Sequence, residues 1–344
     1  MNKKTSSTAA LFFIASPRHY LVARTVARHF ETGSRWILVC YRDKVSQLVD
    51  PAEWDHVIYA PWPRFDPLPG PFGSHRRLLD NMRKVADIVG HADELRLHSP
   101  VFDTEAVNYF LRGLPRLCGA RHMHARILPD GLLNIQRYPL NRAKRITQHF
   151  RRLRRLVSPQ LDYWCFSGDR IGSDAPFVDR IYTLPGFPSP YPKEKVVELP
   201  PLVDTPANGG AGAPRALIVG QPLVGIGALD ADGLADITRR ITDWLAAEGI
   251  VDIDYKAHPR DPNHEFRVSG STLLEIDEPL ETYMARRGYT VIMGVDSTTL
   301  FMARQIFGPV MPILSFGMDR VHIKEAGKHE RTLALMKALS IRIL

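Results

Sequence analysis

The sequence has few of the features that mark secreted, zinc-binding or membrane-spanning proteins. Its 344 residues include only three cysteines, Cys40, Cys118 and Cys165, which are widely spaced and form no CxxC pair. Such a set argues against a disulfide framework or a zinc site and is typical of a reducing compartment. No apolar stretch approaches the roughly 20 residues of a transmembrane helix. The sequence contains neither a Walker A lysine motif nor a GxGxxG fingerprint.

What the sequence does have is an excess of positive charge. Its net charge of +8 favours an anionic partner, such as nucleic acid, acidic lipid or acidic glycan. Residues 1–15, a basic start followed by an apolar run, have the outline of a short signal peptide. The run is short and no cleavage site follows it, so a buried first strand explains it better. We therefore expect a soluble, cytoplasmic protein, with peripheral association at the inner face of the cell membrane as a second expectation.

Strand-like and helix-like segments alternate along the chain, which predicts an α/β fold with parallel sheets. The expected strands are residues 9–15, 35–41, 94–97, 125–128, 215–220, 252–256, 273–275 and 290–293. The expected helices are residues 21–30, 75–89, 104–112, 234–248, 280–286 and 299–306. A stretch rich in proline and glycine interrupts this pattern. We predict an N-terminal domain at residues 1–184, a hinge at 185–214 and a C-terminal domain at 215–344, with a ligand cleft between the domains.

Residues 141–156 form a basic amphipathic segment. Its apolar residues recur at helical spacing, and they are Ile146, Phe150, Leu153 and Leu156. One interpretation is a solvated helix whose apolar stripe is buried. The other is a surface for anionic lipid or glycan, with binding residues Arg142, Arg145, Arg151 and Arg152. Because little aromatic interleaving accompanies these charges, we expect no nucleic-acid partner.

Three short motifs each follow an expected strand: Pro129-Asp130-Gly131, Lys256-Ala257-His258-Pro259 and Asp296-Ser297-Thr298-Thr299. Asp130 is either a general base or part of an ordinary Asp-Gly turn. His258, next to a proline that restricts its backbone, either protonates or hydrogen-bonds a phosphate or is a structural histidine. Ser297 and Thr298 are typical of a helix cap, of a phosphate site, or of both.

Two other acidic patterns carry weaker signals. Glu281 opens an expected helix, where the dipole favours an acid, and it is also a candidate for binding a ribose. The segments 230–232 and 252–254 have the DxD form of metal-dependent glycosyltransferases. The first falls in an expected loop and the second inside an expected strand. We therefore predict no metal site.

Taken together, the motifs resemble those of the bacterial sialyltransferases of GT-B fold, above all the polysialyltransferases and lipooligosaccharide sialyltransferases. Those families share an acid-acid-glycine motif, a His-Pro motif and a paired Ser/Thr motif in this order. The segment 217–223, which contains Gln221, also looks like the opening of their donor domain. The resemblance extends over most of the chain by motif order, with few identical residues. It implies two Rossmann-like parallel-sheet domains facing a central cleft.

The resemblance also implies an inverting transfer of sialic acid, or a related nonulosonate, from a CMP-sugar to a hydroxyl of a surface glycan or glycolipid such as capsule or lipooligosaccharide. Neither a metal nor a cofactor would take part. Asp130 would deprotonate the acceptor, and His258 would protonate or stabilise the departing phosphate. Glu281 would hold the cytidine ribose. The other donor-binding residues would be Gln221, Lys256, Pro259, Ser297 and Thr298.

One position departs from the family pattern, since Pro129 stands where the first acid of the motif is expected. This departure leaves open a different donor, such as CMP-Kdo. A UDP-sugar transferase or epimerase of the same fold is an alternative. A non-enzymatic binder of anionic polymers is another, and it rests on charge alone.

Overall fold

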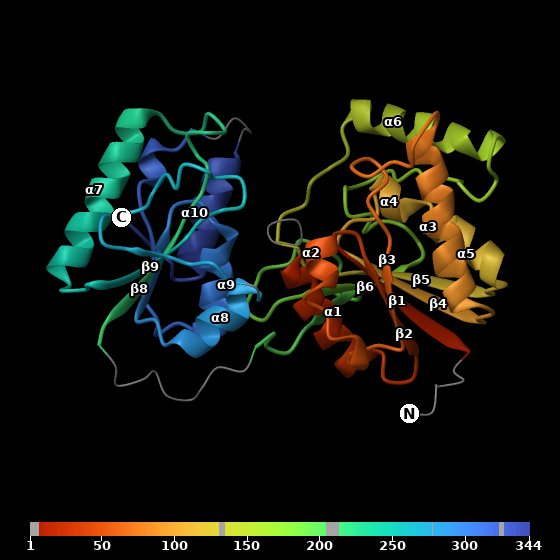
Figure 1. The fold of residues 1–344 in the computed structure, drawn as a ribbon, viewed down its shortest axis with the longest axis horizontal. Helices are drawn as coiled ribbons and strands as arrows, with labels where there is room; N and C mark the ends of the chain where they lie inside the picture. The colour runs from red at the N-terminus through yellow and green to blue at the C-terminus, as the bar shows by residue number, and fades with distance from the viewer. Residues whose placement is uncertain (1–6, 131–134, 204–212, 277, 323–326) are drawn as a thin grey trace. The chain divides into compact units, whose positions relative to one another are not determined.

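The computed structural model describes the chain except for residues 1–6, 131–134, 204–212, 277 and 323–326. The chain divides into two compact units, Met1–Leu202 (unit 1) and Val203–Leu344 (unit 2), and the division falls inside the predicted hinge (Figure 1). Gly131 of the first motif and the whole glycine-rich run at 206–212 lie outside the described residues.

Unit 1 contains a seven-stranded parallel sheet in the order β3-β2-β1-β4-β5-β6-β7. Its strands are β1 (Thr8–Ile14), β2 (Arg35–Cys40), β3 (His56–Tyr59), β4 (Glu94–Ser99), β5 (His122–Ile127), β6 (Val178–Thr183) and β7 (Val196–Glu198). Its helices are α1 (Pro17–Phe30), α2 (Asp43–Ser46), α3 (Gly73–Val89), α4 (Glu105–Asn108), α5 (Phe110–Cys118), α6 (Arg142–Arg152) and the 3₁₀ helices Pro51–Glu53 and Leu153–Leu156. The strand order reverses between β1 and β4, and such a switch point is where α/β sheets bind ligands.

The first strand confirms the interpretation of residues 9–15 as a buried strand. Alternate residues point to opposite faces of the sheet, and both faces of β1 are covered. Leu11 and Phe13 belong to the core that includes side chains of α3 and α5, whereas Phe12 stacks on His98 with 4.2 Å between ring centroids. Helix α1 lies on one side of the sheet, and α3 and α5 lie on the other.

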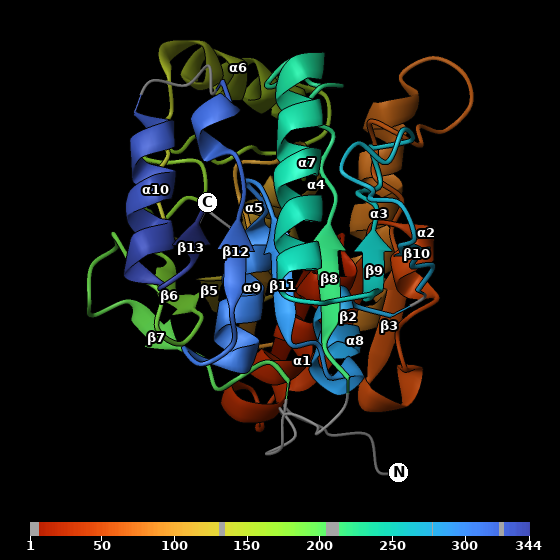
Figure 2. The same ribbon diagram turned by 90° about the vertical axis from the view of Figure 1, so that its left-hand side faces the viewer.

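Unit 2 repeats this topology with a six-stranded parallel sheet in the order β10-β9-β8-β11-β12-β13. Its strands are β8 (Arg215–Val219), β9 (Asp252–Lys256), β10 (Thr272–Leu273), β11 (Val291–Gly294), β12 (Ile313–Ser315) and β13 (Arg342–Ile343). Its helices are α7 (Ala231–Ala247), α8 (Leu280–Arg287), α9 (Thr298–Phe307), α10 (Lys328–Ala338) and the 3₁₀ helix Met318–Arg320. Helix α7 covers one face of the sheet, and α8 and α9 cover the other (Figure 2). The fold class, two Rossmann-like parallel-sheet units, is confirmed; the central cleft stays a prediction.

The structure differs from the sequence-based expectation in several segments. It adds β3, β6, β12, β13, α2 and α10, which were not predicted. Val196–Glu198, expected in the hinge, form a strand because they pair with β6 at the edge of the unit 1 sheet. Helix α1 begins at Pro17, four residues early, because Ser16 caps it by accepting a hydrogen bond from the backbone N–H of His19. The helix expected at 104–112 is two helices, α4 and α5, which meet at Tyr109.

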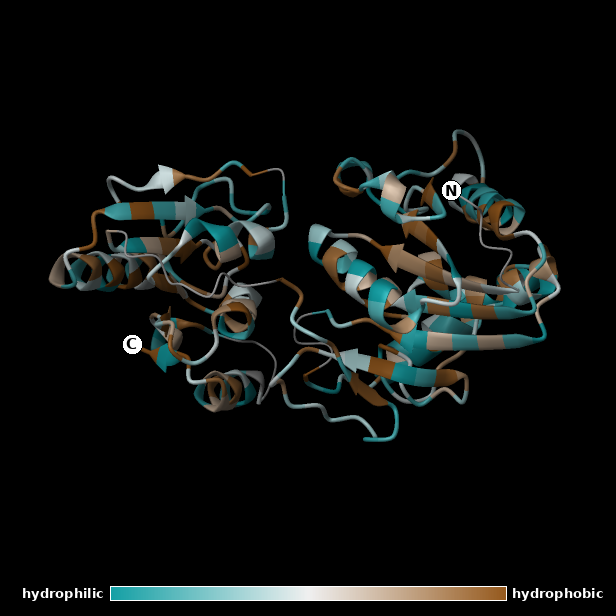
Figure 3. Cartoon of the chain, turned by 90° about the horizontal axis from the view of Figure 1, so that it is seen from below, coloured by the Kyte–Doolittle hydropathy of each residue, from teal (hydrophilic) through white to brown (hydrophobic). Residues whose placement is uncertain are grey.

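Of the two interpretations of residues 141–156, the solvated helix with a buried apolar stripe is wrong. The exposed fractions are 56% for Ile146, 68% for Phe150, 55% for Leu153 and 76% for Leu156. Elsewhere, hydrophobic and hydrophilic residues alternate along the helices of both units, as surface helices require (Figure 3). No helix in the described part of the chain is both long and apolar enough to cross a membrane.

Candidate active site

The three motifs all lie at carboxyl ends of strands, as predicted. Asp130 follows β5 in unit 1, and His258 and Ser297 follow β9 and β11 in unit 2. Because each sheet is parallel, the loops that follow its strands share one edge, where α/β proteins bind ligands. The candidate residues therefore form two half-sites, one in each unit.

In unit 1 the partner of Asp130 is His19, which the sequence analysis missed. His19 Nε2 lies 3.2 Å from Asp130 Oδ1. The backbone N–H of Ala15 donates to His19 Nδ1 at 3.3 Å. A nitrogen that accepts this bond carries no proton, so the proton of the neutral ring is on Nε2 and is donated to the carboxylate. His19 follows β1 in the first turn of α1, and a polar residue just after a strand is the signal that could have revealed it.

This partner keeps Asp130 ionised. Burial alone would raise the pKa of the Asp130 carboxyl, but the hydrogen bond from His19 and the charge of the nearby Arg18 hold that pKa below its usual value. The side chain remains 35% exposed. Asp130 is thus a carboxylate at neutral pH with an accessible face, which is the state a general base needs.

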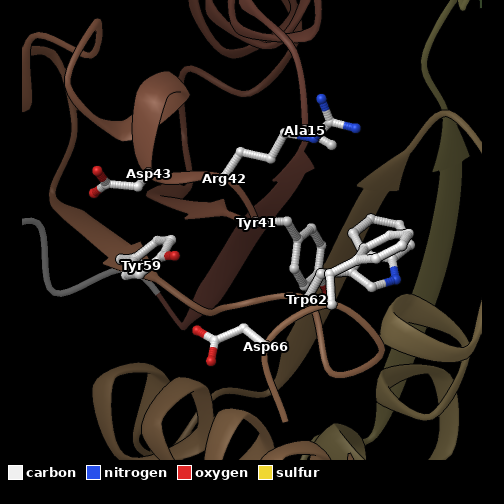
Figure 4. A pocket seen from close by; sticks show the side chains of 8 residues that line it. Ala15, Tyr41, Arg42, Asp43, Tyr59, Trp62 and Asp66 are labelled. Carbon is white, nitrogen blue, oxygen red and sulfur yellow. The ribbon is translucent and has the colours of Figure 1, made fainter.

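An aromatic pocket adjoins this pair. One cavity of about 130 Å³ is lined by His19, Asp130 and residues that include Tyr41 and Trp62. Tyr41 and Trp62 also line a neighbouring cavity of about 540 Å³, with Ala15, Arg42, Asp43, Tyr59, Phe65 and Asp66. Figure 4 shows the rings of Tyr41 and Trp62 together and the carboxylates of Asp43 and Asp66 around them. We call this second cavity the aromatic pocket; aromatic faces with polar groups between them suit a sugar ring.

In unit 2, His258 lies in a turn that the structure holds firmly. Its Nδ1 accepts a hydrogen bond from the backbone N–H of Arg260 at 3.1 Å, so Nε2 carries the proton of the neutral ring. Burial and the charge of Arg260 lower the pKa of His258. Asp261 closes the turn, since its backbone N–H donates to the carbonyl of His258 at 2.9 Å. His258 is therefore a neutral hydrogen-bond donor at pH 7.

Gln221 links the ends of β8 and β11, the two strands at the switch point of unit 2. It follows β8, and its Oε1 accepts a hydrogen bond from the backbone N–H of Asp296 at 2.9 Å, in the loop after β11. At the end of β8 only glycine fits, because a Cβ on Gly220 would lie 2.2 Å from the hydroxyl of Tyr255. The predicted donor residue Gln221 thus orders the loop that leads to Ser297.

The loop after β8 already holds an anion of the protein itself. The backbone N–H groups of Val224 and Gly225 donate to the two carboxylate oxygens of Glu265 at 2.8 and 2.9 Å. A loop in this position commonly binds phosphate, but here Glu265 fills that role. Glu265 lies 40 residues further along the chain than Gly225 and outside the predicted motifs, so the sequence alone did not indicate it.

The N-terminus of α9 is the second anion-binding feature at this edge. Ser297 caps the helix by accepting a hydrogen bond from the backbone N–H of Thr299 at 3.2 Å, so the prediction of a helix cap is confirmed. Ser297 is buried and Thr298 is half-buried at the first helical position. The positive end of the helix dipole lies here and favours a negative group.

The remaining donor candidates surround this edge. Glu281 lies in the first turn of α8, as predicted, and is 9% exposed. Helices α8 and α9 pack against each other. The ammonium group of Lys256, at the end of β9, donates to the carbonyl of Leu274 at 3.3 Å, and Pro259 is exposed. In this structure the side chain of Lys256 therefore hydrogen-bonds the backbone that follows β10.

Of the four arginines proposed to bind an anionic acceptor, three contact the protein itself. Arg151 Nη1 donates to the hydroxyl of Tyr163 at 3.0 Å, and Arg152 Nε lies 3.6 Å from Asp162. Arg142 and Arg145 are exposed, although Arg145 also donates to the carbonyl of Ser167.

The DxD segments have structural roles. Asp230 caps α7 by accepting a hydrogen bond from the backbone N–H of Gly233, Asp252 pairs with Arg215, and Asp254 accepts a hydrogen bond from Tyr289. Among the described residues, no group of three His, Cys, Asp or Glu side chains is arranged to hold a metal ion.

Residues 193–310 match the family model of alpha-2,8-polysialyltransferase (POLYST). The resemblance inferred from the motifs is confirmed over that stretch. It spans about a third of the chain and contains His258 and all of the donor-binding candidates. The match supports a role in glycosyl transfer.

Several solved structures are similar to the chain at low sequence identity. A spinosyn rhamnosyltransferase complexed with thymidine diphosphate is 14% identical, with 96% of this chain and 88% of that chain covered and a TM-score of 0.46. The UDP-GlcNAc 2-epimerase of Neisseria meningitidis is 10% identical, with 95% and 85% covered and a TM-score of 0.47. The E. coli ADP-heptose LPS heptosyltransferase II is 10% identical, with 96% and 98% covered and a TM-score of 0.41. No curated protein matches the chain by sequence.

Proposed function

We propose that the protein is an inverting, metal-independent glycosyltransferase that moves sialic acid, or a related nonulosonate, from a CMP-sugar to a hydroxyl of a surface glycan or glycolipid. The observation that carries the proposal is the polysialyltransferase match at residues 193–310, which includes the half-site of unit 2. In that half-site a neutral histidine, a capped helix N-terminus and a buried acid gather at one edge of a parallel sheet.

In the proposed reaction, Asp130 takes the proton of the acceptor hydroxyl as its oxygen attacks the anomeric carbon of the donor sugar. The bond from that carbon to the phosphate oxygen breaks, and CMP leaves with the electron pair. Asp130 suits this step because His19 keeps it ionised and in a fixed position. The aromatic pocket beside it would hold the acceptor sugar.

The donor side would stabilise the negative charge that develops on the phosphate. The α9 N-terminus with Ser297 and Thr298 would bind the phosphate oxygens, and His258 Nε2–H would donate a hydrogen bond to them. The tautomer set by Arg260 supports hydrogen bonding over full proton transfer. Gln221 would order the loop after β11 that leads to Ser297, and Glu281 would hold the ribose. Lys256 and Pro259 would border the site.

The test is release of CMP from CMP-sialic acid, with and without a sialylated acceptor and with EDTA present. We expect turnover that needs the acceptor and survives EDTA. Asp130→Ala and His258→Ala should each lower the rate by about 10²–10⁴-fold. Full activity in both variants would exclude this mechanism.

The nucleotide can be tested separately from the reaction. We expect CMP to raise the melting temperature of the wild-type protein and UDP to leave it unchanged. Stabilisation by UDP alone would replace the proposal with a UDP-sugar transferase or epimerase. A second variant, Glu265→Gln, tests the loop after β8. It should weaken CMP binding, because it disturbs the hydrogen bonds that hold the backbone of Val224 and Gly225, although Glu265 itself is not proposed to touch the phosphate.

A further inference from the structure

Helix α6 packs against unit 1 through its polar side. Gln148 is 1% exposed, and its amide donates to Asp103 at 3.0 Å. Arg151 donates to the hydroxyl of Tyr163, and Arg154 pairs with Glu105 and lies over the ring of Tyr109. Hydrogen bonds and ion pairs therefore hold this helix in place, in contrast to the usual apolar packing of a surface helix.

The apolar side of the same helix faces outward. It forms a continuous ridge with its 3₁₀ extension, which we call the apolar ridge: Ile146, Phe150, Leu153, Leu156 and Val157. Spacings of three and four residues place these side chains on one face. Leu156 and Val157 are 76% and 80% exposed. A contiguous exposed row of large apolar side chains marks a surface that another partner covers.

The charge around the apolar ridge identifies that partner. Residues 141–157 contain no Asp or Glu and seven Arg or Lys residues. The exposed cations beside the ridge are Arg142, Arg145 and Arg155. The acids beneath the helix, Asp103, Glu105 and Asp162, already contact its polar side. Arg155 lies 3.8 Å from Asp162, whereas Arg142 and Arg145 have no ion pair with an acid among the described residues. The outer face thus combines apolar bulk with an excess of positive charge.

We propose that the apolar ridge and its flanking arginines dock unit 1 onto the surface of an anionic lipid bilayer. The apolar side chains enter the boundary between head groups and acyl chains, and the arginines contact the lipid phosphates. A soluble anionic glycan would satisfy the arginines but leave the ridge in water. A second copy of the chain would cover the ridge but bring two sets of positive charge together. Only the bilayer matches both features, and this inference does not depend on the proposed reaction.

The test is cosedimentation of the full-length protein with vesicles. One set contains phosphatidylglycerol mixed with phosphatidylcholine, and the other contains phosphatidylcholine alone. We expect binding to the anionic vesicles that weakens in high salt, with each surface arginine worth roughly fivefold in affinity. Equal binding to both vesicle types, or no binding to either, would overturn the proposal.

Two pairs of substitutions distinguish binding through the apolar ridge from non-specific hydrophobic adsorption to the vesicles. Phe150→Gln with Leu156→Gln should weaken anionic vesicle binding by about 100-fold, roughly tenfold for each side chain. The matched control is Val251→Gln with Val310→Gln, which alters two apolar residues of unit 2 that are 88% and 91% exposed. The control should bind like wild type, and equal loss in both pairs would contradict the assignment. A dimer in light scattering that Phe150→Gln with Leu156→Gln dissociates would assign the ridge to a second copy instead.

Discussion

His19 donates its Nε2–H to Asp130 Oδ1 at 3.2 Å, while the backbone N–H of Ala15 occupies His19 Nδ1 at 3.3 Å. This relationship joins the loop after β1 to the loop after β5, on either side of β4. It gives Asp130 one orientation and one charge state. His19 acts through Asp130, so we class it as a positioning residue.

The first prediction concerns the pH dependence that this contact sets. In wild type the pKa of Asp130 lies below 3.8, so the base stays ionised down to that pH. In His19→Ala the hydrogen bond that opposes the effect of burial is lost and the charge of Arg18 remains, so the pKa of Asp130 rises. The acid limb of the kcat/KM profile should therefore move to higher pH.

Two further measurements complete this test: the loss of activity in His19→Ala at neutral pH and the pH profile of His19→Gln. At neutral pH, His19→Ala should cost less than the roughly 10²–10⁴-fold loss expected on removing the base itself. His19→Gln retains an N–H donor of similar reach and should return the acid limb toward the wild-type position. An acid limb that stays in place in His19→Ala would show that the contact does not govern Asp130.

The second prediction separates two roles for His258. Because its pKa lies below 6.5, the ring is neutral at pH 7 and its Nε2–H is a hydrogen-bond donor. His258→Gln can donate a hydrogen bond but cannot act as a general acid at this pH. We expect His258→Gln to keep a measurable part of kcat and His258→Ala to lose about 10²–10⁴-fold. Equal, complete loss in both variants, with a wild-type rate that falls as pH rises above 6.5, would instead identify a general acid.

The sequence was sufficient for the architecture and for half of the candidate site. Apolar strands followed by polar loops placed Asp130, His258 and Ser297 correctly, because a parallel sheet collects its strand ends at one edge. Strands β3, β6, β7, β12 and β13 were not predicted; all but β6 have only two to four residues, which carry too little periodicity to detect. Their stability comes from pairing with a neighbour that the sequence does not indicate.

The sequence also did not predict contacts between segments that are distant along the chain. His19 meets Asp130, and Glu265 meets the loop at Val224 and Gly225, only through the fold. For α6 the amphipathic pattern was correctly detected but its orientation was not. Periodicity shows that a helix has two different faces, but the partners Asp103, Glu105 and Tyr163 decide which face is buried.

The third prediction concerns a buried ion network in unit 1. Glu31 is fully buried and bonds His98 at 3.2 Å, Arg96 at 2.9 Å and Arg126. Glu31→Gln should lower the free energy of unfolding by about 3–5 kcal/mol, because it removes the buried charge shared by Arg96 and Arg126 and leaves Arg126 with the charge of Asp179 alone among these partners. Urea denaturation measures this loss. The matched control is Glu53→Gln, which removes an acid from surface pairs with Arg24 and Arg28 and should cost about 1 kcal/mol or less.

The same network predicts how stability changes with pH. Burial lowers the pKa of His98 below 6.5, so the unfolded chain takes up a proton first as pH falls through 6.5. Burial opposes ionisation of Glu31, but its bonds to His98 and the arginines hold the pKa well below 4.5, so the unfolded chain again takes up the proton first near that pH. Both groups therefore stabilise the fold above about pH 6.5 and lose this contribution as the solution is acidified. A Glu31→Gln variant whose acid sensitivity matches wild type would exclude the network as the cause.

The fourth prediction tests the aromatic pocket as the acceptor site. Trp62 lies edge-on to Tyr41 with 5.0 Å between ring centroids, and Phe65 is 74% exposed at the pocket rim. Trp62→Ala should raise the acceptor KM by about tenfold, the value of one aromatic contact, and leave the donor KM as it is, because the proposed donor-binding residues lie in unit 2. Trp62→Phe should recover most of the difference, and Phe65→Ala tests the rim without disturbing packed side chains. Steady-state kinetics with each substrate varied in turn give both constants. If the donor KM rises in step with the acceptor KM, the pocket does not recognise the acceptor alone, and an unchanged acceptor KM in both alanine variants would place the acceptor elsewhere.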